Sequence, residues 1–340
     1  MSLARYIRQI VQGTGSVNDL PEPEAHDLYA AVLDGGASEL ETGAMLAALR
    51  LKGETHTELL GFYRAMSDRV HALKVSSATP RPLVFATYGG GRNEPNLLAL
   101  LPLMLQRLGI PVLLHGTLEG GDRVASVYIL RHLGILPCVT LAQAQKAMDQ
   151  DGLAFVPTAV LCPALAAQLA LRSRLGFRNT AHTLAKVINP FQQRSVQVAS
   201  ATRCEQFSRL EALLSATGVE ALLLKGTEGE PFANPRQRPR MLYFKDGVRR
   251  TLFDEEPVSC RGSVSLPAAV DAAATAAWIR LAVNGRVPVP HPLVNQFACC
   301  LFASGYTEDM NQAKAIAAVE AGGLAPRPVD DAAAQTLVTQ

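Results

Sequence analysis

The sequence predicts an α/β protein in which an N-terminal helical domain precedes a larger α/β domain with a mainly parallel central sheet. Three observations predict this architecture. The chain has 340 residues, which is more than a single small core requires. Apolar residues recur at helical spacing in the first part of the chain. Further along, short continuous apolar runs alternate with helical stretches, which is typical of βαβ units.

The N-terminal helical domain is expected to span residues 1–74. Apolar positions from Leu3 to Val11 follow the spacing of an amphipathic helix. Ser38 precedes Glu41 by three residues, which is the spacing of a capping box at the start of a helix. Thr55 and Glu58 repeat this signal. We therefore expect four helices in this domain.

Residues 75–82 are rich in Ser, Thr and Pro and predict a linker or hinge. The α/β domain is expected to span residues 83–325, and residues 326–340 to form a flexible tail. Strands are expected at residues 83–86, 112–114, 155–156, 196–198 and 221–224. Asp246-Gly247 is a turn signal and predicts a hairpin over residues 241–253. Helices are expected at residues 94–108, 122–133, 268–284, 292–303 and 308–320.

Composition and charge exclude several classes of protein. Hydrophobic residues make up 48% and charged residues 18% of the chain, as in ordinary globular proteins. No apolar run approaches the roughly 18 residues of a membrane span, and Arg5 and Arg8 interrupt the N-terminus where a signal peptide would be apolar. The six cysteines form no C-x-x-C pair, so buried free thiols are expected rather than a metal site. These features predict a cytoplasmic protein without a membrane partner.

A glycine-rich loop follows the first expected strand and reads Tyr-Gly-Gly-Gly-Arg at residues 88–92. A strand, a glycine loop and a helix together present backbone N–H groups to a phosphate. The alternative is a tight turn without a ligand. Loops after other strands, including residues 225–230, would meet this loop at the carboxyl edge of the sheet. The candidate residues of this cleft are Tyr88, Gly89, Gly90, Gly91, Arg92, Asn96, His115 and Gly116.

The order of these motifs resembles the anthranilate phosphoribosyltransferase family, within the glycosyltransferase family 3 superfamily, over nearly the whole chain. In detail the chain is similar to the YbiB-type branch of that family. The motifs that carry the resemblance are Leu-Gly-Phe-Tyr at 60–63, Arg-Asn-Thr-Ala-His-Thr-Leu-Ala-Lys at 178–186, Gly-Thr-Glu-Gly-Glu at 226–230, Ala-Asn-Pro at 233–235 and Ala-Cys-Cys-Leu at 298–301. The resemblance implies a fold like those of nucleoside phosphorylases and phosphoribosyltransferases. It also implies a homodimer formed through the N-terminal helical domain.

Several groups that the enzymes of this family use are absent. Their Gly-Thr-Gly-Gly-Asp loop is matched by Thr-Tyr-Gly-Gly-Gly at 87–91, which lacks the acid. Residues 96–99 read Asn-Leu-Leu-Ala in place of Asn-x-Ser-Thr, so the hydroxyls that hold the pyrophosphate are lost. The Asp-Glu pair that binds Mg²⁺ aligns with Pro231-Phe232. Each lost donor or ligand costs about 2–4 kcal/mol of transition-state stabilisation, so we expect no catalytic residues.

Two arginines of the enzymes' substrate site are kept. The resemblance places Arg172 at the position that contacts the anthranilate carboxylate, and Arg178 in the Leu-Gly-x-Arg segment. Glu228 and Glu230 are weak candidates to hold Mg²⁺ in place of the missing pair. No cofactor is expected unless the chain is a phosphoribosyltransferase, which would need Mg²⁺.

Basic residues are segregated from acidic ones along the chain. No Asp or Glu occurs from residue 152 to residue 204, and a second basic cluster covers residues 236–250. Segregated bases bind polyanions with little dependence on sequence. The residues expected to bind nucleic acid are Arg172, Arg174, Arg178, Lys186, Arg194, Lys225, Arg236, Arg238 and Arg240. The aromatic residues among them either stack on unpaired bases or belong to the core, and they are Phe177, Phe191, Phe232, Tyr243 and Phe244.

The main hypothesis is a sequence-tolerant nucleic-acid-binding protein for DNA or RNA, favouring single strands, on a degenerate enzyme scaffold. The resemblance agrees, since the YbiB-type group is understood as nucleic-acid-binding dimers without the biosynthetic activity. The alternative is a phosphoribosyltransferase for anthranilate or another aromatic acceptor, using phosphoribosyl pyrophosphate and Mg²⁺. A third possibility is a regulatory protein that binds a phosphorylated metabolite in the old cleft. His115 and His182 serve either as hydrogen-bonded structural groups or in acid–base chemistry.

Overall fold

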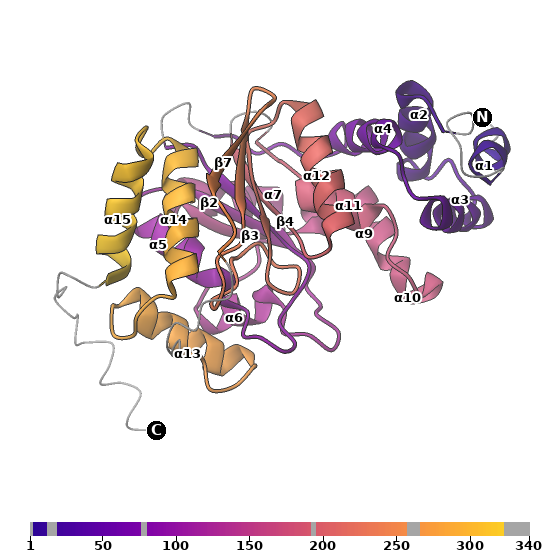
Figure 1. Ribbon diagram of the computed structural model, residues 1–340. Helices are drawn as coiled ribbons and strands as arrows, with labels where there is room; N and C mark the ends of the chain where they lie inside the picture. The colour runs from indigo at the N-terminus through magenta and orange to yellow at the C-terminus, as the bar shows by residue number, and fades with distance from the viewer. Residues whose placement is uncertain (1–2, 12–18, 76–79, 192–194, 257–265, 323–340) are drawn as a thin grey trace, which may run out of the picture.

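The computed structural model describes residues 3–11, 19–75, 80–191, 195–256 and 266–322. A helical bundle lies at one end of the molecule and the helices of the C-terminal part lie at the other (Figure 1). The bundle consists of α1 (Ala4–Val11), α2 (Glu22–Leu33), α3 (Glu39–Lys52) and α4 (His56–Ser67). The four helices expected from the sequence are therefore confirmed.

The starts of α3 and α4 show why these helices form where they do. Ser38 Oγ accepts a hydrogen bond from the N–H of Glu41, whose carboxylate accepts one from the N–H of Ser38. Thr55 and Glu58 repeat this reciprocal arrangement at α4. Both capping boxes satisfy N–H groups that a helix leaves without a partner. Gly61 lets α4 cross α2 closely, because a Cβ there would lie 2.5 Å from the carbonyl oxygen of Glu22.

The α/β domain contains one seven-stranded sheet in the order β3-β2-β1-β4-β5-β6-β7. Its strands are β1 (Leu83–Thr87), β2 (Val112–Gly116), β3 (Leu153–Pro157), β4 (Val196–Ala201), β5 (Ala221–Lys225), β6 (Met241–Lys245) and β7 (Val248–Phe253). The first five strands pair in parallel, which confirms the mainly parallel sheet. β6 and β7 add an antiparallel hairpin at the edge, turned by Asp246 and Gly247 at positive φ.

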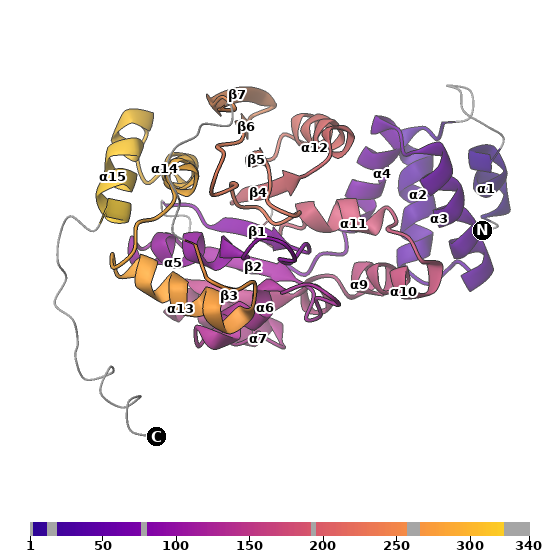
Figure 2. The same cartoon turned by 60° about the horizontal axis from the view of Figure 1, so that its bottom comes forward.

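Successive residues of each strand enter two different cores, as expected of strands covered on both faces. Val84 and Leu113 face the core that continues into the helical bundle, whereas Phe85 and Leu114 face the other core. The first core includes residues of α7 (Leu141–Gln150), α9 (Pro163–Ala170), α11 (Ala181–Leu184) and α12 (Cys204–Thr217). The second is covered by α5 (Leu100–Arg107), α6 (Ser126–His132), α13 (Ala272–Val283), α14 (His291–Ser304) and α15 (Met310–Gly322). Figure 2 shows α12 on one face of the sheet and α5 and α13 on the other.

The two expected helices nearest the glycine loop begin later than the sequence predicts, and α13 and α15 also start two to four residues late. The Asn96 side chain accepts the N–H of Leu98 and starts the short 3₁₀ helix η1 (Leu97–Ala99), so the expected helix at 94–108 becomes η1 followed by α5. The expected helix at 122–133 is reduced to α6, because Val124 pairs its backbone with Gly91. Part of the expected linker (residues 76–79) and the expected tail (326–340) lie outside the described residues.

Candidate functional site

Loops from the carboxyl ends of several strands meet at one edge of the sheet. The loop after β1 carries the three glycines, and the loop after β5 carries Glu228 and Glu230. These two loops are joined by hydrogen bonds, and Ser126, which follows β2, also reaches Glu230. The sequence expectation that these loops converge is therefore confirmed.

Glu230 occupies the place where the glycine loop would hold an anion. The N–H groups of Gly89 and Gly90 both donate to Oε1 of Glu230, each at 2.6 Å. Ser126 Oγ donates to the other oxygen at 3.2 Å. Burial raises the pKa of Glu230, and the hydrogen bonds from Thr87, Gly90 and Gly89 act in the opposite direction. Two successive N–H groups on one carboxylate oxygen form an anion-binding nest, and the protein fills it with its own side chain.

Glu228 accepts hydrogen bonds from the residues that follow the three glycines of the same loop. Its carboxylate accepts the backbone N–H groups of Arg92 at 2.5 Å and Asn93 at 3.1 Å. Asn93 Nδ2 donates to it as well. Burial opposes the effect, but these hydrogen bonds lower the pKa of Glu228 overall. Both weak Mg²⁺ candidates therefore direct carboxylate oxygens at backbone donors, and among the described residues no cluster of three His, Cys, Asp or Glu side chains is arranged to hold a metal ion.

His115 and Asn96 do not face an open cleft, which corrects the expectation from sequence. His115 is fully buried in β2, where its Nδ1 lies 2.9 Å from the hydroxyl of Tyr88. Burial lowers the pKa of His115 to about 3, so the ring is neutral. Asn96 is buried too and caps η1. A Cβ on Gly116 would lie 2.1 Å from the carbonyl oxygen of Thr87, so this glycine serves close packing.

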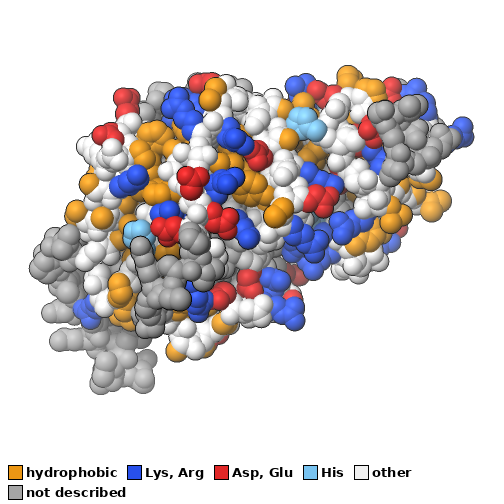
Figure 3. Space-filling view, in the orientation of Figure 1, with side chains coloured by type: hydrophobic (Ala, Val, Ile, Leu, Met, Phe, Trp, Pro, Cys, Tyr) orange, Lys and Arg blue, Asp and Glu red, His pale blue; other side chains and the backbone are white. Residues whose placement is uncertain are grey.

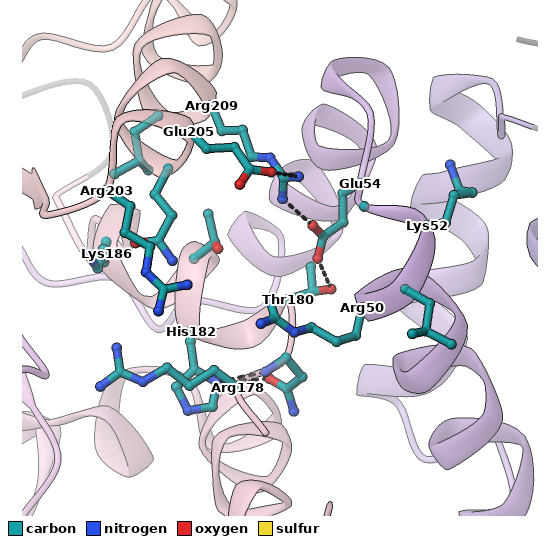
Figure 4. Close-up of a pocket in the computed structure, with 16 residues that line it drawn as sticks. Arg50, Lys52, Glu54, Arg178, Thr180, His182, Lys186, Arg203, Glu205 and Arg209 are labelled. Atoms are coloured by element: carbon teal, nitrogen blue, oxygen red, sulfur yellow. Dashed lines mark hydrogen bonds and ion pairs between the residues drawn. The ribbon is translucent and has the colours of Figure 1, made fainter. Parts of the chain in front are cut away.

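A separate cavity of about 500 Å³ lies between the helical bundle and the α/β domain. Arg50 enters it from the end of α3, and Arg178, Lys186 and Arg203 enter it from the α/β domain. Figure 4 shows Arg50 extending into this space from the bundle and Arg203 from the opposite wall. In the space-filling view, Lys and Arg side chains gather at the junction of the two domains (Figure 3). We call this cavity the cationic cleft, after Arg50, Arg178, Lys186 and Arg203.

Some cations of the cleft wall are neutralised and others are not. Arg209 pairs with Glu54 at 2.8 Å and with Glu205 at 2.7 Å. Lys52 pairs with Asp19 and Glu58. The four cations that name the cleft have no ion pair with a carboxylate of the described residues. The cleft therefore carries a net excess of positive charge.

The titration of the cleft side chains reflects this field. Burial, followed by Arg178 and Arg172, lowers the pKa of His182 to about 4. Burial and then Arg178 lower the pKa of Lys186 to about 8. Burial and the neighbours Arg172, Arg123 and Arg203 also lower the pKa of Arg178. Burial is the largest cause of each shift, and the neighbouring arginines add to it.

The remaining basic residues predicted from the sequence have different surroundings. Arg174 forms a two-pronged pair with Glu39 at 2.9 Å. Arg236 pairs with Glu94, and Arg238 pairs with Glu256. Arg172 is exposed beside the cleft, and Arg194 lies outside the described residues. Lys225 and Arg240 line a smaller cavity of about 290 Å³, whose wall shares Arg203 with the cationic cleft.

Most of the aromatic residues that lie among these bases belong to the core. Phe191, Phe232, Tyr243 and Phe244 are at most 3% exposed, so stacking on bases is excluded for them. Phe177 is half-buried. Phe232 thus places a buried ring where the enzymes' Mg²⁺-binding pair aligns. Sequence reasoning missed Arg50, because it belongs to an acidic part of the chain and reaches the cleft only through the packing of the two domains.

Comparison with known proteins places this architecture in a family. Residues 4–70 match the helical bundle domain of a glycosyl transferase family. The uncharacterized protein YbiB of Escherichia coli is 39% identical over 307 residues, which cover 90% of the chain and 95% of YbiB. The chain belongs to the YbiB-type branch of the anthranilate phosphoribosyltransferase-like family. Anthranilate phosphoribosyltransferase of Geobacillus kaustophilus is 25% identical over 317 residues, 92% of each chain.

Solved structures share the fold of this YbiB-type chain. Anthranilate phosphoribosyltransferase of Thermus thermophilus has a TM-score of 0.72 at 21% identity, covering 94% of both chains. The Saccharomyces cerevisiae enzyme in complex with PRPP and Mg has a TM-score of 0.69 at 13% identity, covering 94% of this chain and 93% of its own. Among the described residues of the YbiB-type chain, no helix has the length and apolar character needed to cross a membrane.

Proposed function

We propose that the chain is a sequence-tolerant nucleic-acid-binding protein that uses the cationic cleft of an anthranilate phosphoribosyltransferase-like scaffold. The observation that carries this proposal is the group of four cleft cations without carboxylate partners in the described part of the chain. A phosphate backbone neutralises such cations and releases its own counterions, which gives affinity without reading sequence. Lys225 and Arg240 line the neighbouring cavity, which shares Arg203 with the cationic cleft, so basic residues continue from one cavity to the next.

The glycine loop supports a binding function over phosphoribosyl transfer. Its N–H groups at Gly89 and Gly90 are taken by Glu230, so they are not free to hold a pyrophosphate leaving group. Stabilisation of that leaving group needs Mg²⁺ and fixed donors. The residues present do not fit Mg²⁺, because Glu228 and Glu230 point at backbone donors and Phe232 is buried.

The test is binding of a fluorescent single-stranded oligonucleotide, followed by anisotropy in rising salt. Wild-type affinity should fall steeply with salt. The double variant Arg178→Gln/Arg203→Gln should bind more weakly and with a salt slope smaller by about 1.4, since each phosphate contact on a single strand contributes roughly 0.7. The matched control is Arg236→Gln/Arg238→Gln, whose arginines are paired with Glu94 and Glu256 and should matter less.

Two results would overturn this proposal. One is the absence of binding at low salt. The other is wild-type binding that does not respond to salt. If the control double variant loses affinity and the cleft variant does not, the binding surface lies around residues 236–250 instead.

Phosphoribosyl transfer is the second candidate, and the comparisons favour it. Relatives named anthranilate phosphoribosyltransferase match most of the chain, and the yeast structure holds PRPP and Mg. Arg172 and Arg178 of the substrate site are also kept. The assay is pyrophosphate release from PRPP with Mg²⁺ and anthranilate. Release above background that Arg178→Gln abolishes would establish this function in place of the first.

We also propose that the chain forms a homodimer through α3. Leu40 and Leu51 are 82% and 88% exposed, and Ala44 and Ala47 lie between them at helical spacing. Val11 of α1 is 63% exposed at the same end of the molecule. A helix face this apolar is covered by a second copy in many proteins. The free thiols of the described cysteines fit a reducing, cytoplasmic location.

A further inference from the structure

Lys186 differs in its surroundings from Lys52, the other lysine that lines the cleft. It extends from η2 (Ala185–Val187), is half-buried, and donates a hydrogen bond from Nζ to the carbonyl oxygen of Ser200 at 2.6 Å. No carboxylate of the described residues forms an ion pair with it. Lys52, by contrast, is held by Asp19 and Glu58 at 2.8 Å each. Figure 4 shows Lys186 on the wall of the cleft that also carries Arg203.

These surroundings increase the fraction of Lys186 that is unprotonated. The charged groups that act on Lys186 are Arg178, which lowers its pKa, and Glu230, which raises it. Burial is the larger effect, and together they bring the pKa to about 8. Roughly one amine in ten is then unprotonated at neutral pH, against fewer than one in a thousand for an ordinary lysine. An unprotonated amine is a nucleophile toward carbonyl groups.

The rest of the cleft determines which carbonyl compounds fit. Arg178 and Arg203 line the same cavity as Lys186, and the structure gives them no carboxylate partner within the described residues. Arginine binds phosphate through two parallel hydrogen bonds. An amine beside such arginines suits a molecule that carries an aldehyde and a phosphate. The volume of about 500 Å³ accommodates a small molecule of this kind.

We propose that Lys186 captures phosphorylated aldehydes in the cationic cleft as a reversible imine. The neutral Nζ attacks the carbonyl carbon, and a carbon–nitrogen bond forms to give a carbinolamine. The former carbonyl oxygen then leaves as water, taking the two hydrogens that Nζ carried, and a carbon–nitrogen double bond results. No oxidant or reductant takes part. The capture stands without the proposed nucleic-acid binding, because a free phosphorylated aldehyde suffices.

The probe for this chemistry is pyridoxal 5′-phosphate added to the full-length protein. Its imine absorbs visible light, and borohydride reduction fixes it for peptide mass spectrometry. We expect saturable labelling at Lys186 ahead of other lysines. Pyridoxal without the phosphate should label roughly tenfold less, because the charge-assisted hydrogen bonds to arginine are lost. Inorganic pyrophosphate should compete with the labelling.

Two variants distinguish loss of imine formation from loss of folding. Lys186→Arg keeps a positive charge and a donor for Ser200 but cannot form the imine, so labelling in the cleft should vanish while the melting temperature is retained. Lys146→Arg, at an exposed position of α7 away from both cavities, should leave the labelling unchanged. Equal labelling of wild type and Lys186→Arg would overturn the proposal. Labelling spread evenly over exposed lysines such as Lys225 and Lys245 would also overturn it.

A second arm identifies the source of the aldehyde. A single-stranded oligonucleotide with one abasic site carries a sugar aldehyde next to phosphates, and borohydride would trap it on Lys186. Trapping by this strand assigns the capture to damaged nucleic acid. Labelling of Lys186 by pyridoxal 5′-phosphate alone assigns it to small phosphorylated aldehydes.

Discussion

At the scale of single residues, Glu230 is the side chain whose role is least expected. It is 1% exposed and supplies the anion that Gly89 and Gly90 bind. The glycine loop therefore keeps the geometry of a phosphate site while being unavailable to phosphate. A carboxylate has taken the place of an external ligand, and the contact links residues 141 positions apart in the chain.

Glu230→Ala should uncover the loop. Removing the carboxylate leaves two buried N–H groups without a partner, which should lower the free energy of unfolding by about 1–3 kcal/mol. Pyrophosphate should then raise the melting temperature of the variant more than that of the wild type, because the vacated donors bind it. Glu230→Gln keeps one acceptor oxygen and is the matched control. Equal stabilisation of wild type and Glu230→Ala would show that the loop does not bind anions when emptied.

His115 should make the protein sensitive to acid. Its pKa in the folded chain is about 3 against an ordinary value of 6.5, so the folded state binds fewer protons than the unfolded state between these values. Stability conferred by the neutral ring is present above the ordinary pKa and is lost as the pH falls. His115→Gln should reduce the pH slope of the unfolding free energy by up to about 1.4 kcal/mol per pH unit below roughly pH 6.5. Denaturant melts across this range measure it, with exposed His56→Gln as the control; an unchanged slope would contradict the prediction.

At the scale of elements, α3 serves two surfaces. One end contributes Arg50 and Leu51 to the wall of the cationic cleft, while Leu40 and Ala44 lie on an exposed apolar face. The apolar face and one wall of the cleft therefore share a single helix. A partner subunit bound to this face would fix the position of Arg50 in the cleft.

Leu40→Asp combined with Ala44→Asp should convert the proposed dimer to a monomer. Two carboxylates placed in an apolar interface remain desolvated and unpaired, which costs several kcal/mol. Light scattering after size-exclusion chromatography measures the mass. Leu136→Asp with Val139→Asp is the control, because these exposed apolar residues lie in the segment between α6 and α7. A wild-type mass of one chain at micromolar concentration would contradict the proposal.

At the scale of the whole molecule, the sequence predicted the fold better than the site. The capping boxes at Ser38 and Thr55 and the apolar runs of β1 to β5 depend on neighbouring residues, so they could be read directly. The start of α6 could not be predicted in this way, because the backbone of Val124 pairs with that of Gly91. That pairing becomes visible only once the loops are placed together.

At the site, too, the sequence predicted what depends on neighbouring residues and missed what depends on tertiary contacts. Arg178 and Lys186 were found because they lie in a long stretch without acids. The pairing of Arg174 with Glu39 and of Arg236 with Glu94 could not be predicted, since each joins residues more than a hundred positions apart. Charge along a sequence indicates a basic region, but tertiary contacts decide which cations remain unpaired.

The contacts of Glu54 bear on how fast an anion associates with the cationic cleft. Its carboxylate accepts a hydrogen bond from Thr180 at 2.6 Å and pairs with Arg209 at 2.8 Å, so a loop of the bundle is fastened to two parts of the α/β domain (Figure 4). These two contacts join the bundle wall of the cleft to the α/β wall in the unliganded chain. Under the proposed function, an incoming anion meets cations that already line the cleft in this arrangement. We therefore expect long-range electrostatic attraction to govern the association rate. The rate constant should be high in dilute buffer and low in concentrated salt.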